Sequence, residues 1–240
     1  GQAEAMIDLH SHILPQMDDG SRSVDESLQM LAALAAQGVT DVAATPHFYA
    51  SENSPERFLA RRRHAWQRLA PHLTASLPTV HLGAEVLYFE GIAGYDELTQ
   101  LCLAGTDTLL LEMPFRPWSR RMYDELRELT ARRDVTVLLA HMERYLPYVE
   151  EADWQRMTRG GVLLQSNADF FCGFSTRRKA LRLLREGWIR VLGTDCHNMT
   201  SRAPRMDEAV RRIARSLGED AVLRLETQAA ALLPAREAAP

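Results

Sequence analysis

Seven short apolar stretches rich in β-branched residues, separated by longer segments with helical periodicity, constrain the fold more than any other feature of this chain. The apolar stretches span residues 6–9, 39–45, 79–85, 108–112, 135–141, 161–166 and 188–194. The segments with helical periodicity span residues 23–37, 56–69, 122–133, 153–159, 177–186, 207–217 and 219–233. Strands that alternate with helices form βαβ units with parallel strands. Seven such units in 240 residues predict an α/β fold whose strands close into a barrel.

The alternation runs without interruption over residues 6–235, which predicts a single domain. No linker-like tract rich in proline, glycine or serine divides this region, and it contains no internal repeat. Residues 1–5 precede an internal Met6, and we interpret them as an added remnant or a disordered end. They are therefore left out of the predicted fold.

Charge and cysteine content exclude several classes of protein. The 28 basic and 32 acidic residues give a net charge of −4, so no basic field favours a nucleic-acid partner. The three cysteines form no CxxC pair, which excludes a thiolate zinc finger and suits a reducing cytoplasm. No apolar run reaches the roughly 20 residues that span a bilayer, and no signal peptide is recognisable. We therefore expect a cytoplasmic protein without membrane insertion.

Side chains able to bind metal ions fall at the ends of nearly all the predicted strands. They are His10, His12, His47, Glu85, Glu112, His141, Asp195 and His197, with Asp19 in the loop after the first strand. The carboxyl ends of barrel strands meet at one mouth, so these distant residues would become neighbours. The sequence therefore predicts a metal centre at that mouth. His64, His72 and His81 fall elsewhere and are expected to be structural or surface residues.

Five histidines and four carboxylates would serve two or three ions at three or four ligands per ion. Nitrogen and oxygen donors suit Zn, Mn or Fe(II). His10 and His12 are two residues apart, as are Asp195 and His197, so each pair points to one side of an extended chain.

Two of these residues have plausible alternative roles. Glu112 could instead be a buried carboxylate paired with Arg116 or Arg144, and Asp19 could be only a turn residue before Gly20. Both alternatives stay open on the sequence alone.

Two arginines extend the prediction to an anionic substrate. Three divalent ions against four carboxylates would leave an excess of positive charge at the mouth. Arg144 and Arg202 follow histidine-bearing strand ends by three and five residues, which brings both towards the mouth. The guanidinium group offers a bidentate fork suited to phosphate.

Seven motifs, taken in order, carry a family resemblance: MIDLHSHILP-x-MDDG, AATPH, GAEV, LLLEMP, LAH-x-ERY, Q-x-N and GTD-x-HN-x-x-x-RAP. The chain resembles the PHP (polymerase and histidinol phosphatase) superfamily, and within it the bacterial tyrosine phosphatases of capsule and exopolysaccharide biosynthesis. The resemblance runs from Met6 to about Pro204 and beyond. It implies a distorted, TIM-like (β/α)7 barrel of PHP type. It also implies a three-metal centre, usually loaded with manganese, with iron or zinc as alternatives.

The resemblance also assigns roles by motif match. The implied ligands are His10, His12, Glu85 and Asp195 for the first ion, Glu85 (bridging), Glu112 and His141 for the second, and Asp19, His47 and His197 for the third. Arg144 and Arg202 correspond to the phosphate-contacting arginines of the family.

The implied activity is that of a metal-dependent protein-tyrosine phosphatase linked to control of exopolysaccharide or capsule synthesis. A hydroxide that bridges two ions would attack phosphorus, while the third ion and the arginines stabilise the developing charge. The implied partner is a phosphotyrosine-bearing protein, for which a bacterial tyrosine kinase of polysaccharide synthesis is a candidate. The chain departs from the family pattern at Phe48, Tyr49, Met142 and residues 167–172, in loops that would rim the mouth. An aromatic ring of the substrate could lie against Phe48, Tyr49, Phe170 or Phe171.

Several other functions compete with this hypothesis. The nearest is a PHP-type phosphatase that acts on a small alkyl phosphate such as histidinol phosphate. A nuclease or proofreading domain disagrees with the net charge, and a degenerate binding barrel disagrees with the full set of ligands. Cys196 to Arg202 also has the C-x5-R spacing of cysteine-dependent phosphatases. The residues between them lack the glycines of a phosphate-cradling loop, so we expect Cys196 to be structural.

Overall fold

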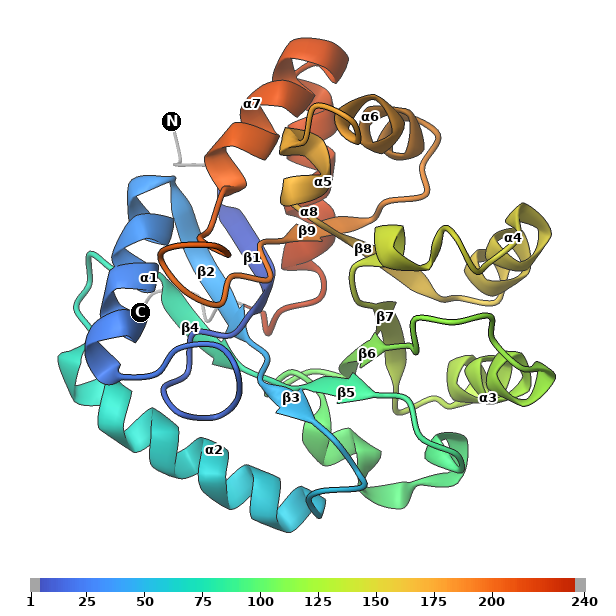
Figure 1. Cartoon of the computed structure of the whole chain (residues 1–240), viewed down its shortest axis with the longest axis horizontal. Helices are drawn as coiled ribbons and strands as arrows, with labels where there is room; N and C mark the ends of the chain where they lie inside the picture. Colours follow the sequence, from blue (N-terminus) through green and yellow to red (C-terminus); the bar gives the residue numbers. More distant parts are fainter. Residues whose placement is uncertain (1–4, 236–240) are drawn as a thin grey trace.

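Parallel strands form the centre of the molecule, and helices lie outside them (Figure 1). The computed structural model describes residues 5–235. Its strands are β1 (Met6–Ser11), β2 (Val39–Ala44), β3 (His47–Phe48), β4 (Thr79–Leu82), β5 (Glu85–Leu87), β6 (Thr108–Glu112), β7 (Thr136–Leu139), β8 (Leu163–Asn167) and β9 (Val191–Gly193). They pair in the orders β1-β2-β4 and β3-β5-β6-β7-β8-β9, and every ladder is parallel.

Nine strands stand where seven were predicted, because the short strand β3 follows the predicted stretch 39–45, and the stretch 79–85 is interrupted before its last residue, where β5 begins. β2 and β3 are separated by residues 45–46, where Pro46 has no N–H to donate to a ladder, and β4 and β5 are separated by residues 83–84. β9 returns to the side of β1, where Asp195 N donates to His10 O at 2.6 Å and His12 N donates to Cys196 O at 2.9 Å. The predicted distorted (β/α)7 barrel is confirmed.

The helices follow the predicted periodicity closely. They are α1 (Val24–Ala36), α2 (Pro55–Leu69), α3 (Arg120–Ala131), α4 (Glu151–Arg159), α5 (Asp169–Cys172), α6 (Arg177–Arg185), α7 (Met206–Leu217) and α8 (Glu219–Ala230). Four 3₁₀ helices, η1 (Ala70–His72), η2 (Ile92–Gly94), η3 (Asp96–Leu101) and η4 (Met142–Tyr145), and the one-turn α5 were not predicted. Such short turns carry no helical periodicity that a sequence pattern can reveal.

A small apolar cluster fills the interior of the barrel. It joins Leu9 of β1, Ala43 of β2, Leu110 of β6 and Val191 of β9 to Ala229 of α8. Strands such as β2 and β6 are not neighbours, so their side chains can meet only inside the ring. A second, larger cluster packs the outer strand faces against the helices.

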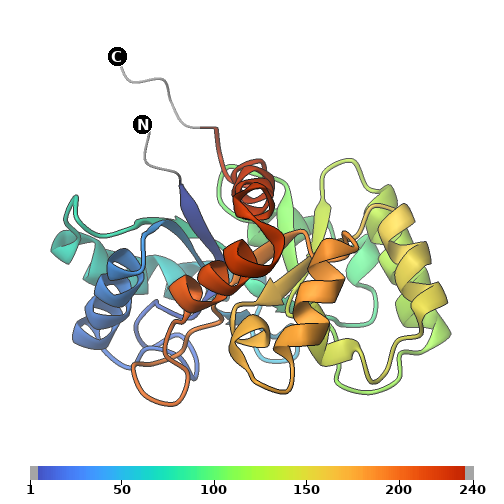
Figure 2. The same ribbon diagram turned by 90° about the horizontal axis from the view of Figure 1, so that it is seen from above.

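The carboxyl ends of the strands open on one side of the molecule. The long loops that follow β1 and β9 project from this side together (Figure 2). The face of β6 that carries Leu110 into the interior also carries Glu112, two residues later, to the mouth. Residues 1–4 of the predicted remnant lie outside the described residues. Within the described part of the chain, no helix has the length and apolar character needed to cross a membrane.

Candidate metal centre

Four predicted ligands from three parts of the barrel converge at the mouth. His10 lies near the end of β1 and His12 directly follows it, Glu85 begins β5, and Asp195 follows β9. Glu85 Oε1 lies 3.1 Å from both His10 Nε2 and His12 Nε2. Asp195 Oδ1 lies 3.2 Å from His10 Nε2 and 3.1 Å from His12 Nε2. All four side chains are buried, so the cluster is closed to bulk water except through the mouth.

The donor atoms of this cluster lie close together but do not form hydrogen bonds with one another. Although they lie so close, His10 Nε2, His12 Nε2 and Glu85 Oε1 make no hydrogen bond of acceptable geometry. Each buried polar atom without a partner costs about 1–3 kcal/mol. A divalent cation shared by these atoms would satisfy all three. The residues therefore fit a metal ion.

A second group lies on the other side of Glu85. His141 Nε2 is 3.1 Å from Glu85 Oε2 and 2.9 Å from Glu112 Oε2. The alternative pairing of Glu112 with Arg116 or Arg144 is absent among the ion pairs of the described residues. The two oxygens of Glu85 thus face two different groups of histidines, as a bridging carboxylate must.

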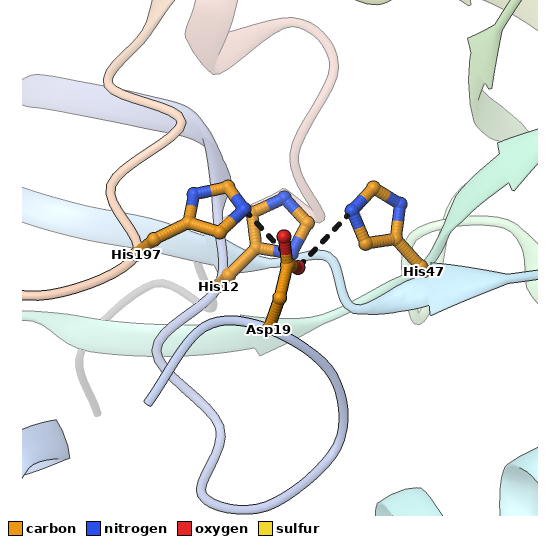
Figure 3. A group of neighbouring side chains, drawn as sticks. All are labelled: His12, Asp19, His47 and His197. Carbon is orange, nitrogen blue, oxygen red and sulfur yellow. Dashed lines mark ion pairs between the residues drawn. The ribbon is translucent and has the colours of Figure 1, made fainter. Parts of the chain in front are cut away.

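The third group comprises Asp19, His47 and His197 together with His12, and Figure 3 shows the Asp19 carboxylate between the two outer imidazoles. Asp19 Oδ1 lies 3.4 Å from His197 Nε2 and 3.6 Å from His47 Nε2. His47 also presents Nδ1 to Glu85 Oε1 at 3.3 Å, so its two ring nitrogens face two groups. Asp19 therefore reaches the cluster instead of serving only the turn. The assignment of each residue to a particular ion stays a prediction.

The histidines excluded from the site lie elsewhere, as predicted. His64 and His72 are exposed on α2 and η1. His81 is engaged with Asp41, whose Oδ1 lies 3.0 Å from His81 Nε2.

The buried carboxylates are held in their ionised form. Burial disfavours charge on Glu85, but the neighbouring imidazoles of His10, His12 and His141 together outweigh burial and hold the pKa of Glu85 well below its usual value. Burial also disfavours charge on Asp195, but His10 and His12 together outweigh it and depress the pKa of Asp195. The site therefore presents two anionic ligands at any pH near neutrality.

Two residues that support the ligands were missed by the sequence analysis. Asp18 Oδ2 accepts from His12 Nδ1 at 2.8 Å and from His47 N at 3.0 Å, and thereby orients two ligand segments. Gln165 Oε1 lies 2.9 Å from His10 Nδ1 and accepts from His141 N at 2.9 Å. Gln165 lies on β8, the strand from the one predicted stretch that carries no metal ligand. The absence of a metal ligand from this stretch was the signal that its polar residue has a supporting role.

Backbone strain and crowding accompany the ligands. His141 and Asp195 have φ angles of 35° and 53°, a region that residues other than glycine rarely adopt and that costs about 1–3 kcal/mol per residue. A Cβ atom at Gly193 would lie 2.5 Å from His10 Cβ, so only glycine fits beside this ligand. The strained and crowded backbone positions therefore coincide with the candidate metal ligands.

The two predicted arginines meet at one carboxylate oxygen. Arg144 Nη2 donates to Asp195 Oδ2 at 3.2 Å, and Arg202 Nη2 donates to the same atom at 3.1 Å. Their side chains are 39% and 37% exposed, so other guanidinium N–H groups stay free for an anion. Asn198 Oδ1 accepts from Arg202 N at 2.8 Å and closes the loop that carries Arg202.

Of the four aromatic residues proposed on sequence, three are buried and one, Tyr49, is partly exposed. Phe48, Phe170 and Phe171 are buried packing residues. Tyr49 is partly exposed and stacks on His47, with ring centroids 5.2 Å apart. Phe115 was missed by the sequence analysis. It is 50% exposed, 5.7 Å from the His141 ring and 5.9 Å from the ring of Tyr145, on which it stacks.

Cys196 lies in the core and not in the site. Its side chain is buried in the larger apolar cluster, and burial raises the pKa of its thiol well above the usual value. A neutral, enclosed thiol is a poor nucleophile. The C-x5-R match is therefore accidental, as predicted.

Sequence comparison finds relatives along nearly the whole chain. A family profile described as "Capsular polysaccharide synthesis, CpsB/CapC" matches residues 6–233. The tyrosine-protein phosphatase YwqE of Bacillus subtilis (strain 168) is 29% identical over 241 aligned residues, which cover 95% of this chain and 91% of that protein. The tyrosine-protein phosphatase CpsB of Streptococcus pneumoniae is 27% identical over 224 residues, which cover 89% of this chain and 91% of that protein.

Solved structures share the fold. A chain from the crystal structures of YwqE from Bacillus subtilis and CpsB from Streptococcus pneumoniae, metal-dependent tyrosine phosphatases, matches with a TM-score of 0.82 at 22% identity. The match covers 97% of this chain and 100% of that chain. The phosphotriesterase homology protein from Escherichia coli, with phosphate in its active site, matches with a TM-score of 0.56 at 12% identity, over 95% of this chain and 98% of that chain.

Replacing Glu85 should reduce metal content at two groups together. In Glu85→Gln an amide NH₂ replaces one carboxylate oxygen, so either the His10–His12 side or the His141 side loses an anionic ligand and the shared charge is lost. We expect elemental analysis of the purified variant to show loss of more than one ion per chain. Glu52→Gln, an exposed change outside the cluster, is the control. An unchanged metal content in Glu85→Gln would contradict the bridging role.

Metal binding should release protons near neutral pH. Burial lowers the pKa of His141, but hydrogen bonds to Glu112 and Glu85 outweigh burial and raise the pKa to about 9. The metal-free protein therefore holds a proton on His141 below pH 9, and an ion must displace it. For each proton displaced, apparent affinity should fall about tenfold per pH unit below that value. His197, whose pKa is lowered to about 4 by burial and the charge of His12, should release none.

Titration calorimetry of the demetallated protein with Mn²⁺, in buffers of different ionisation enthalpy at pH 7.5, measures the proton count. Zero released protons would contradict the raised pKa of His141.

Proposed function

The chain belongs to the capsular polysaccharide synthesis family CpsB/CapC, and we propose that it is a metal-dependent protein-tyrosine phosphatase. The observation that carries the proposal is the meeting of two chemistries at Asp195. Its Oδ1 faces the imidazoles of His10 and His12, and its Oδ2 faces the guanidinium groups of Arg144 and Arg202. A site that binds cations next to a site that binds anions is what hydrolysis of a phosphate monoester requires. Two relatives are named tyrosine-protein phosphatases, which supports the same activity.

We assign two or three divalent ions to the cluster. The ligands would be His10, His12, Glu85 and Asp195 for the first, Glu85, Glu112 and His141 for the second, and Asp19, His47 and His197 for the third. Manganese is our first choice, with iron or zinc as alternatives, because the donors are nitrogen and oxygen only. When bound, such ions supply Lewis acidity, which lowers the pKa of water and neutralises phosphoryl charge.

The arginines would bind the phosphoryl group and orient it for in-line attack. Asp195 Oδ2 holds one N–H of each guanidinium and fixes the two groups side by side. Their free N–H groups would donate to the equatorial oxygens, on which negative charge builds in the transition state. Asn198 keeps Arg202 in this position through the backbone.

The substrate would be an aryl phosphate carried on a protein. Tyr49 and Phe115 flank the Glu112 region of the mouth, where they would contact the ring of phosphotyrosine. A phenol leaving group (pKa about 10) departs more readily than an alkoxide, which favours tyrosine phosphate over histidinol phosphate. A tyrosine kinase of polysaccharide synthesis is our candidate partner. The three cysteines are buried and free, which supports a reducing, cytoplasmic location.

Metal removal and substrate choice test the proposal together. The chelated protein should lose phosphatase activity and recover it with Mn²⁺. The metal-loaded protein should hydrolyse a phosphotyrosine peptide and p-nitrophenyl phosphate well above histidinol phosphate, and iodoacetamide should leave these rates unchanged because no thiol takes part. Full activity after complete demetallation would exclude the metal mechanism. A preference for histidinol phosphate would favour the alkyl-phosphate alternative.

Arg144→Ala and Arg202→Ala should each lower kcat by about 10²- to 10³-fold, because each removes a preorganised donor to the transition state. Metal content should stay the same, since neither arginine is an ion ligand. Arg127→Ala, on the exposed face of α3, is the control and should be fully active. Losses below threefold in both site variants would remove the arginines from the phosphate site.

A further inference from the structure

Helix α6 carries an unusual concentration of positive charge for a protein with a net charge of −4. Five of its nine residues are basic and none is acidic: Arg177, Arg178, Lys179, Arg182 and Arg185. Among the described residues, the only ion pair made by any of these five joins Arg182 Nη1 to Glu186 Oε1 at 3.5 Å. On α7, by contrast, Arg211 and Arg212 are each paired with an acidic residue one turn away. The charge of α6 is therefore left largely uncompensated.

The basic residues lie on the outer face of α6. The buried face is formed by Ala180 and Leu183, which pack into the core, whereas Arg178, Lys179, Arg182 and Arg185 are exposed. A continuous cationic surface along a helix is therefore open to a partner.

An exposed aromatic residue extends this surface at the start of α6. Phe174 is 87% exposed, and the Arg177 guanidinium lies 5.0 Å from its ring centroid. The turn that holds Phe174 is fixed from within, because Thr176 Oγ1 donates to Phe170 O at 2.9 Å and Arg177 N donates to Gly173 O at 2.9 Å. An ordered apolar ring among cations is typical of an anchoring position in a protein interface.

The surface is continuous with the mouth of the barrel. The short helix α5 follows β8 at the mouth, contacts both α6 and α7, and leads directly into the Phe174 turn (Figure 1). Asp169 of α5 lies 3.9 Å from Arg205, which begins α7 just after the Arg202 loop. Asp169 and Glu186 lie at the two ends of this route, and Glu208 is paired with Arg205.

A groove deepens the surface on its other side. It lies between α4 and α6, has a volume of about 200 Å³, and is lined by Lys179, Arg182, Leu146 and Trp188 among others. Glu151 and Glu186 also line the groove, so its charge is balanced, and its apolar walls would accept an uncharged side chain of a bound polypeptide.

We propose that this basic rim, formed by Phe174, Arg177, Arg178, Lys179, Arg182 and Arg185, binds an acidic segment of the substrate protein next to the phosphotyrosine. The inference rests on the proposed phosphatase function and adds the chemistry of the partner. Asp and Glu side chains would pair with the rim while the phosphate reaches Arg144 and Arg202. Complementary charge of this kind raises the rate of encounter and selects among partners.

The shape of the rim favours a polypeptide over a membrane. The turn that holds Phe174 joins α5, which follows β8, to α6, and α6 lies on the outside of the barrel (Figure 2). The rim is therefore not confined to one flat face. An extended chain can follow such a surface, whereas a flat bilayer would meet only one side of it. Phe174 is also the only residue of the rim with a large exposed apolar side chain, which is little for insertion into lipid.

The test compares two doubly charge-reversed variants. Arg178→Glu/Lys179→Glu changes the rim, and Arg120→Glu/Arg127→Glu makes the same change of charge on α3. We would measure kcat/KM of the metal-loaded enzymes for a phosphotyrosine peptide with Asp and Glu flanks, for its Asn and Gln counterpart, and for p-nitrophenyl phosphate. The wild-type enzyme should prefer the acidic peptide, and the preference should shrink with added salt.

The rim variant should lose about tenfold in kcat/KM on the acidic peptide, as like charges now meet. It should keep its rate on p-nitrophenyl phosphate, which also shows that it is folded. The α3 variant should keep the preference. Equal kcat/KM for both peptides in the wild-type enzyme, or an undiminished preference in the rim variant, would overturn the proposal.

Two further measurements separate the remaining outcomes. Fluorescence anisotropy with the acidic peptide carrying unphosphorylated tyrosine reports docking without turnover. Binding that the rim variant loses would support the rim even if no phosphotyrosine peptide were hydrolysed, a result that would overturn the phosphatase function alone. Sedimentation with phosphatidylserine vesicles tests the other anionic partner. Rim-dependent vesicle binding without peptide preference would overturn the peptide proposal in favour of a membrane.

Discussion

Two buried carboxylates, Glu85 and Asp195, impose the conditions that the rest of this barrel satisfies. They are 1% and 4% exposed, and an ionised carboxylate withdrawn from water costs several kcal/mol unless opposite charge lies beside it. The strand ends supply that charge through His10, His12 and His141. The mouth is therefore stable only when it holds positive charge, either protons on imidazoles or divalent ions between the ligands. The pairing of β9 with β1 meets the same requirement, because it brings the Asp195 carboxylate beside His10 and His12.

The sequence was sufficient for the architecture and for the positions of the inner residues, for one physical reason. Parallel strands in a barrel end at a single mouth, so a polar residue at the end of an apolar stretch has its position set by the fold class. Glu112 is the clearest case: four apolar or β-branched residues of β6 precede it, and alternation places it above Leu110 at the mouth. Residues in the loops did not have this advantage. Asp19 was a candidate ligand on the sequence, but a role in the turn alone stayed open, because a loop residue has no periodicity to fix its direction.

The sequence could not reveal which residues contact the candidate ligands from behind or from the side. Asp18 and Asp19 are adjacent acidic residues, yet one orients His12 from behind and the other faces His197. Nothing in composition distinguishes them, because the difference is a backbone direction within an irregular loop. Phe115 was missed for a related reason: it lies beyond the end of β6, and its place beside His141 depends on how that loop folds back.

The site becomes progressively more exposed from its centre outwards. The buried residues at the centre are fixed by packing, whereas the exposed residues at the edge are not. The carboxylates at the centre are buried, the arginines over them are somewhat more than a third exposed, and the cations of α6 lie in solvent. A change at the centre would disturb the whole cluster together, because Asp195 lies beside His10 and His12 on one side and Arg144 and Arg202 on the other. A change on the rim alters only a screened, solvent-exposed charge, worth about 1 kcal/mol or less for each pair. If the rim binds substrate as proposed, substrate selection lies where the barrel can alter it at little structural cost, away from the buried ligand cluster.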